Sequence, residues 1–322
     1  MVHGDGRLED AHVRDLPRYL STGDLLVFND TRVIPAALKG IRPARDANGA
    51  DVVVDANLVE RLGSDTWLTL ARPGKRLKVG DNIRFGDGFE AAVVGKREDG
   101  ETILKFAFAG EALEAALDLH GAMPLPPYIA RRRAADALDR DSYQTAFADG
   151  EAASVAAPTA GLHFTARLLD EFDQAGLRRE FVRLHVGLGT FAPLKDSQID
   201  AGKLHAEWRH ISPEVASRIN STRTKGNKCV AVGTTALRTL ESSTSPDGIV
   251  EPVSGATDIF LRPGYRFRAT DALITNFHLP KSSLFMLVCA LIGTDTMQAA
   301  YAHAVRDGYR FYSYGDACLL LP

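Results

Sequence analysis

Residues 24–36, DLLVFNDTRVIPA, contain the pattern that decides the fold. Residues 24–28 predict a buried strand, and this apolar run passes directly into Asn29, Asp30 and Thr31. Polar groups that directly follow a buried strand are typical of strand ends that open into a functional crevice in an α/β enzyme. The segment therefore predicts both a sheet and one edge of a polar site.

Six further segments are rich in glycine, proline or apolar residues, and most of them pair an apolar run with Thr, His, Asn, Arg or Ser. They are PLPPYI (124–129), AAPTAGLHF (156–164), LHVGLGTF (184–191), VGTTALRTLE (232–241), TNFHLPKSSL (275–284) and YRFYSYGDA (309–317). One such segment would indicate a loop, whereas seven indicate a large polar site assembled from distant parts of the chain.

The pattern differs between residues 38 and 108, where apolar runs such as VVVDANLVERL and ILKFAF alternate with Gly and Asp turns. This spacing is typical of a small antiparallel barrel or sandwich. After residue 154 helices and strands alternate, as in an α/β sheet, with a last strand expected at 309–312. We predict an α/β sandwich domain from residues 1–38 and 120–322, with an inserted antiparallel β-barrel domain at 39–119.

Length and composition are those of a globular protein of about two domains, with 322 residues, 45 % hydrophobic and 25 % charged. Cys229, Cys289 and Cys318 lie in apolar runs, fit no zinc or disulfide pattern, and suit a reducing cytoplasm. The polar N-terminus predicts no signal peptide, and the most apolar stretch, 284–292, is too short to span a bilayer. We expect a cytoplasmic monomer without membrane association.

The net charge of −3 argues against a nonspecific nucleic-acid coat, although local patches can still bind RNA. Two basic patches are candidates for tRNA binding: Arg72, Lys75, Arg76 and Lys78, and the triplet Arg131, Arg132 and Arg133. The alternative is that both are ordinary solvated loops.

Several motifs allow an ordinary structural interpretation. Gly187-x-Gly189-x-x-Ala192 matches a dinucleotide fingerprint in spacing, but Pro193 follows where a helix should begin. Arg238 and Glu241 are three residues apart and could simply pair on a helix surface. The histidines match no metal-binding spacing, so we expect no metal. The aromatics of YRFYSYGDA either stack a base or form a core strand.

Together these segments resemble the S-adenosylmethionine:tRNA ribosyltransferase-isomerase family of queuosine biosynthesis. The resemblance rests on NDTRVIPA, PLPPYI, YQT (143–145), AAPTAGLHF, LHVGLGTF, AVGTT-x-x-RTLE, ITNFHLPKS and YRF-x-SYGDA, in the family's order from about residue 20 to the end. The family has an α/β domain with an inserted β-barrel. S-adenosylmethionine donates a ribosyl unit to 7-aminomethyl-7-deazaguanine at the tRNA wobble position, giving epoxyqueuosine-tRNA, adenine and methionine. S-adenosylmethionine is thus a co-substrate, and no cofactor is implied.

The reaction requires proton transfer, and the acid–base candidates are His163, His185, His278 and Asp316. The expected substrate-binding residues are Asn29, Thr31, Arg32, Tyr128, Thr159, Gly161, Gly187, Gly189, Thr190, Thr234, Thr235, Arg238, Glu241, Thr275, Asn276, Lys281, Arg310 and Tyr314. Two features depart from the family pattern. About twenty residues that usually precede the strand at Leu25 are not found, and the H-x-MH-x-E element is GKLHAE (202–207) here. The alternative function is therefore a non-catalytic or weakly active tRNA-binding paralogue.

Overall fold

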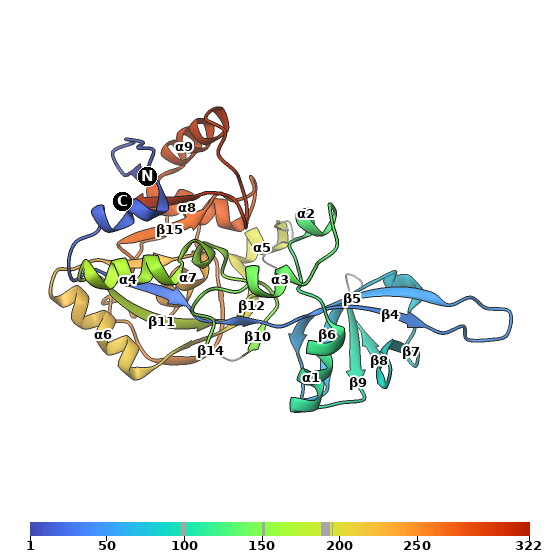
Figure 1. The fold of residues 1–322 in the computed structure, drawn as a ribbon. Helices are drawn as coiled ribbons and strands as arrows, with labels where there is room; N and C mark the ends of the chain where they lie inside the picture. Colours follow the sequence, from blue (N-terminus) through green and yellow to red (C-terminus); the bar gives the residue numbers. More distant parts are fainter. Residues whose placement is uncertain (98–100, 150–151, 188–193, 195) are drawn as a thin grey trace. The chain divides into compact units, whose positions relative to one another are not determined.

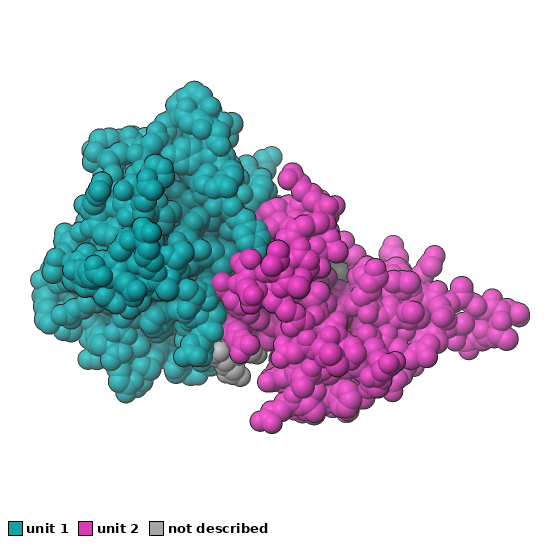
Figure 2. Space-filling model, in the orientation of Figure 1, with its two compact units in different colours: residues 1–31, 145–151, 158–322 teal, residues 32–144, 152–157 magenta. Residues whose placement is uncertain are grey.

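The computed structural model describes residues 1–97, 101–149, 152–187, 194 and 196–322. The chain forms two compact units, coloured separately in Figure 2. Unit 1 contains residues 1–31, 145–151 and 158–322, and unit 2 contains residues 32–144 and 152–157. Figure 1 labels their helices and strands.

Unit 1 is built on an eight-stranded sheet in the order β1-β16-β15-β13-β2-β11-β12-β14. Its strands are β1 (Val2–His3), β2 (Leu25–Asn29), β11 (Arg178–Leu184), β12 (Lys203–Ile211), β13 (Cys229–Val232), β14 (Val253–Ile259), β15 (Ala272–Asn276) and β16 (Ala317–Leu321). Four neighbouring strands run parallel to one another: β15, β13, β2 and β11. Leu26 of β2 lies opposite Val230 of β13 on one side and Arg179 of β11 on the other. The carboxyl ends of these strands therefore meet at one edge of the sheet.

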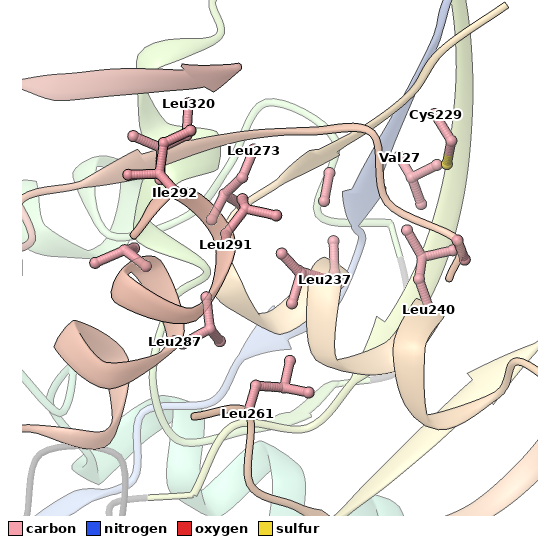
Figure 3. Packing of buried hydrophobic residues seen from close by; sticks show 14 of the residues in the cluster. Val27, Cys229, Leu237, Leu240, Leu261, Leu273, Leu287, Leu291, Ile292 and Leu320 are labelled. Carbon is pink, nitrogen blue, oxygen red and sulfur yellow. The ribbon is translucent and has the colours of Figure 1, made fainter. Parts of the chain in front are cut away.

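Both faces of the central part of this sheet are covered, which explains why β2, β13 and β15 are buried along their whole length. Leu25 and Val27 of β2 belong to one core cluster and Leu26 and Phe28 to the other, because successive side chains alternate between faces. The first cluster, partly drawn in Figure 3, includes residues of α6 (Pro213–Thr224), α7 (Thr234–Ser242), α8 (Ser283–Ile292) and α9 (Thr294–Arg306). The second includes residues of the 3-10 helices η1 (Val13–Arg18) and η4 (Thr159–His163) and of α4 (Ala166–Gln174).

Local signals set where the helices of unit 1 begin. The hydroxyl of Ser212 accepts a bond from the Val215 N–H (3.2 Å) at α6, and that of Ser282 accepts one from Phe285 (3.1 Å) at α8. A short helix α5 (Asp196–Ala201) precedes β12. Within the described residues no single helix could cross a membrane, and α8 and α9 meet that test only as a pair bent by 114°.

Unit 2 contains a closed barrel in the order β4-β5-β6-β9-β8-β7. Buried and exposed residues alternate along its strands, as a barrel interior requires; Phe89 and Phe106, for example, stack inside at 5.4 Å. The strands are β4 (Ala37–Arg42), β5 (Val52–Arg61), β6 (Thr66–Arg72), β7 (Asn82–Gly86), β8 (Phe89–Lys96) and β9 (Glu101–Phe106). Unit 2 also has β3 (Arg32–Val33), β10 (Ala152–Ser154), η2 (Gly74–Arg76), α1 (Gly110–His120), α2 (Pro127–Ala130) and α3 (Leu138–Ser142).

The expected fold class, an α/β sandwich domain with an inserted antiparallel β-barrel, is confirmed. The division differs from the expected boundaries at residues 32–38, 120–144 and 152–157, all of which belong to unit 2. Met123, Leu125 and Tyr143 form a buried cluster there with Val33 and Ala157. The strand expected at 309–312 is wrong. Tyr312 has φ 75°, which extended backbone does not allow, and the last strand is β16.

Candidate active site

The candidate site lies at the carboxyl edge of the parallel strands of unit 1. β2 ends at Asn29, β11 at Leu184, β13 at Val232 and β15 at Asn276. Polar residues lie at each of these ends or within two residues after it, and ligands of open α/β sheets bind at this edge.

Asn29 joins the ends of β2 and β11. Its Nδ2 donates to the Leu184 carbonyl (3.0 Å), and its Oδ1 accepts from the N–H groups of Leu184 (3.1 Å) and Thr31 (3.2 Å). The Thr31 hydroxyl lies 3.1 Å from Nδ1 of His185. Asn29 therefore links the ends of β2 and β11 by hydrogen bonds, and Thr31 orients the His185 ring.

The other side of His185 is held by an aromatic stack that the sequence analysis missed. The His185 ring lies on Trp208 of β12, with 4.8 Å between centroids and 13° between planes, and Trp208 lies 5.9 Å from His210. The available signal was the spacing of Trp208 and His210, which places both on one face of a strand. A flat aromatic surface of this kind suits a nucleobase.

His163 is fixed by residues from two different motifs. Oγ1 of Thr159 donates to Oδ1 of Asn276 (2.9 Å), and Nδ2 of Asn276 lies 3.1 Å from Nε2 of His163. Gly161 allows the turn between them, because a Cβ there would come within 2.8 Å of Thr145 and Phe147. Nδ1 of His163 has no hydrogen-bond partner in the described part of the chain, so this nitrogen is available for proton exchange.

His163 lines a cleft of about 700 Å³ together with Arg310, Tyr314 and Asp316. All four were expected site residues. The lining also includes Asp10, His12 and Tyr19, which the sequence analysis missed because no motif surrounds them.

The cleft combines a carboxylate with a neutral histidine. Burial lowers the pKa of His163; the nearby charge of Asp316 opposes this effect and that of Arg310 adds to it. Burial raises the pKa of Asp316, but hydrogen bonds from Arg310 outweigh it and the pKa lies below its ordinary value. Those bonds are from the Arg310 backbone N–H (2.7 Å) and Nη2 (2.9 Å). Such a pair can accept a proton and stabilise the resulting imidazolium.

His278 follows β15 and is not among the residues that line the cleft. Its Nε2 lies 2.9 Å from the hydroxyl of Thr275, and its backbone N–H donates to the Tyr301 hydroxyl (2.7 Å). Loss of solvation lowers the pKa of His278 to about 4. The ring is therefore neutral at neutral pH and suits hydrogen bonding better than acid catalysis.

The turn between β13 and α7 brings Thr234, Thr235 and Arg238 to the same edge. Gly233 has φ 90°, a left-handed backbone that glycine adopts without strain, and α7 begins directly after it. All three side chains are buried, and Nη1 of Arg238 pairs with Glu207 of β12. Glu207 also accepts the backbone N–H of Gly187 at 3.1 Å.

Arg238 and Glu241 do not pair with each other on a helix surface, because both are buried and each has other partners. Oε1 of Glu241 accepts the N–H groups of Ala269 (3.1 Å) and Thr270 (3.0 Å). Its Oε2 accepts the N–H of Arg268 (2.9 Å) and the Tyr265 hydroxyl (3.2 Å). Glu241 therefore holds the loop before β15 in place.

Two other motif residues have unusual backbones. Lys281, which is exposed, has φ 59°, and Tyr312 has φ 75°. Left-handed backbone is uncommon outside glycine and is concentrated at functional sites. Gly189 and Thr190, expected to bind substrate, lie outside the described residues.

The remaining expected residues belong to unit 2. Arg32 is exposed and Tyr128 is half-buried in α2. Arg131 and Arg132 are exposed, whereas Arg133 forms a two-point pair with buried Asp139 at 2.6 and 2.7 Å, which fixes the 133–139 loop. The exposed cations at the turn after β6 form no ion pair with a described carboxylate; they are Arg72, Lys75, Arg76 and Lys78.

One group of metal-ligand types occurs among the described residues: Asp10, His303 and Asp307, with ligand atoms within 4.8 Å of one another. Nε2 of His303 faces Asp10 (2.9 Å) and Nδ1 faces Asp307 (2.8 Å). Both ring nitrogens are thus satisfied by carboxylates, which is an ordinary ion-pair arrangement.

The chain has an α/β domain with an inserted barrel, and its cleft places a histidine near a carboxylate. These features define an enzyme that uses acid–base chemistry on a bound substrate. The family model described as "Queuosine biosynthesis protein" matches residues 1–320, and the chain belongs to this family.

Named relatives agree with this assignment. The chain is 67 % identical over 322 residues to the S-adenosylmethionine:tRNA ribosyltransferase-isomerase of Hyphomonas neptunium, covering 100 % of this chain and 92 % of the relative. It is 56 % identical to the protein of that name from Methylorubrum populi, covering 98 % and 89 %. The crystal structure of S-adenosylmethionine tRNA ribosyltransferase from Thermotoga maritima matches with a TM-score of 0.52 and 33 % identity, covering 99 % of this chain and 90 % of that one.

Proposed function

We propose that this chain transfers the ribosyl part of S-adenosylmethionine to tRNA and isomerises it there, with release of adenine and methionine. The acceptor is the amine of 7-aminomethyl-7-deazaguanine at the wobble position, and the product is epoxyqueuosine-tRNA. S-adenosylmethionine is a co-substrate, and the reaction takes place in the cytoplasm. The full-length match to enzymes of this name supports the proposal.

The single observation that carries the chemistry is His163 beside Asp316 in one cleft. The reaction needs a base to remove a proton from the carbon beside the sulfonium, and an acid to assist the departure of adenine. His163 is neutral at neutral pH, and in the tautomer that carries its proton on Nε2 the ring accepts a proton at Nδ1 and returns it to the leaving adenine. Asp316 stabilises the imidazolium between these two steps.

Asn276 and Thr159 support this proton shuttle. A threonine hydroxyl both donates and accepts, so the Asn276 amide can present either its nitrogen or its oxygen to Nε2 of His163. The ring is held in place in both of its neutral tautomers. Thr31 and Trp208 hold His185 in a corresponding way, and we assign that ring to substrate positioning.

The test is adenine release by His163→Gln in the presence of S-adenosylmethionine and the modified tRNA. We expect turnover to fall about a hundredfold, the scale of a lost acid–base group, with an unchanged melting temperature. His120→Gln is the matched control, because that ring stacks on Phe89 in unit 2 and should leave turnover unchanged. Full activity of folded His163→Gln would overturn the assignment. A wild-type chain that binds tRNA without releasing adenine would instead indicate a non-catalytic paralogue.

We also propose that unit 2 binds the tRNA backbone. A protein with a net charge of −3 needs a local basic surface for this purpose. The exposed cations Arg72, Lys75, Arg76, Lys78, Arg131 and Arg132 supply it, while Arg133 fixes the loop that carries the last two.

A further inference from the structure

We infer that Arg238 and Thr235 of α7 form a subsite for a carboxylate, and that it binds the carboxylate of the methionine part of S-adenosylmethionine. The identity of the ligand rests on the proposed function. The chemical class of the ligand rests on the side chains alone.

Arg238 is a buried cation that the fold leaves partly unsatisfied. The residue is 5 % exposed and Nη1 pairs with Glu207, whereas Nε and Nη2 have no hydrogen-bond partner among the described residues. A charged donor that is buried and unpaired is costly to a fold. Retaining two such donors on one guanidinium is explained if a partner arrives from outside the chain.

A second arginine, Arg209, shows how an arginine with a purely structural role connects α7 to β12. Arg209 of β12 donates from Nε to Ser243 (3.1 Å), from Nη2 to the Ser242 carbonyl (3.0 Å) and from Nη1 to the Gly255 carbonyl (3.4 Å). All three of its nitrogens are used at the far end of α7. Arg238 joins the same helix and strand through one nitrogen only.

The Thr235 hydroxyl adds a third open donor beside the two of Arg238. This hydroxyl is buried and has no partner in the described part of the chain. Residues three apart share one face of a helix, so Thr235 and Arg238 are neighbours on α7. Thr235 lies in the first turn of that helix, where the backbone N–H groups favour negative charge, and Arg238 begins the next turn.

The subsite lies at the candidate active site, because Glu207 pairs with Arg238 and also accepts the N–H of Gly187, just beyond the end of β11. A carboxylate can accept Nε and Nη2 of one guanidinium side by side. A carboxylate and a phosphodiester of the tRNA backbone each carry one negative charge, but only an amino-acid head group also carries an ammonium group, which the carboxylate of Glu207 complements. An amino-acid head group therefore fits better than a phosphate of the tRNA backbone.

The test uses decarboxylated S-adenosylmethionine, which keeps the adenosine and the sulfonium and lacks only the carboxylate. Calorimetry without tRNA should show that the wild type prefers S-adenosylmethionine over this analogue by about 30-fold, the scale of a charged hydrogen-bonded pair. In Arg238→Gln the preference for S-adenosylmethionine over the analogue should fall to about threefold or less, because the guanidinium that binds the carboxylate is gone.

Arg209→Gln is the matched control and should keep the full preference while losing stability. If Arg238→Gln does not fold, Arg238→Lys, which keeps the charge without the two-point geometry, takes its place. The inference fails if either Arg238 variant weakens both ligands equally, or if only tRNA binding changes. A failure of the proposed function would appear separately, as absence of adenine release by the wild type.

Discussion

Replacing Glu241 tests whether this carboxylate holds the fold or binds substrate. It accepts three backbone N–H groups, from Arg268, Ala269 and Thr270, and the Tyr265 hydroxyl. A buried donor left without an acceptor costs about 1–3 kcal/mol. Glu241→Ala strips all three N–H groups and should cost about 3 kcal/mol or more, whereas Glu241→Gln keeps one oxygen and should cost about 1–3 kcal/mol.

The assay is thermal unfolding together with S-adenosylmethionine binding by the folded fraction. A loss of about 3 kcal/mol corresponds to a melting-temperature drop of about 6–12 °C in a domain of about 150–250 residues, the size range of unit 1, which contains Glu241. We expect that drop for Glu241→Ala, a smaller one for Glu241→Gln, and unchanged affinity in both. The reasoning is refuted if the melting temperature stays constant while the affinity falls, because Glu241 would then contact substrate as the sequence analysis expected.

Three further predictions follow from the geometry. His278 has a folded pKa of about 4 against an ordinary 6.5, so the unfolded chain binds more protons between these values and stability is lost as the pH falls from 6.5 to 4. At most about 3 kcal/mol is involved, and His278→Gln should flatten that part of a stability–pH profile. Trp208→Leu should lower turnover about tenfold without a matching loss of tRNA affinity, because His185 loses the ring that holds it; unchanged turnover would contradict this role. Neutralising four unit 2 cations should reduce the salt slope of tRNA binding by about 0.7–0.9 per lost phosphate contact, and an unchanged slope would exclude them: Arg72, Lys75, Arg76 and Lys78.

The sequence was most informative where local pattern and fold agree. The apolar run at residues 24–28 corresponds to β2, because burial of a strand is read from a local pattern of apolar residues. The strand predicted at 309–312 failed because Tyr312 adopts a left-handed backbone, which its aromatic neighbours in the sequence do not reveal.

The contacts of the site could not be predicted in the same way, because they join distant residues. The bond between Asn276 and His163 spans 113 positions, and that between Thr31 and His185 spans 154. Glu241 and Arg238 belong to the same motif, yet Glu241 holds a loop whereas Arg238 has two unpaired donors. Motif membership identified the right segments, whereas only the fold separates the roles within them.

The central claim is that S-adenosylmethionine serves this chain as a ribosyl donor, and product analysis of one reaction tests it most directly. The purified protein is incubated with S-adenosylmethionine and tRNA carrying the 7-aminomethyl-deazaguanine base, and both the small molecules and the tRNA are analysed by mass spectrometry. We expect adenine and methionine in amounts equal to the tRNA modified, and neither when either substrate is omitted. Formation of S-adenosylhomocysteine, or tRNA binding without any adenine, would contradict the account.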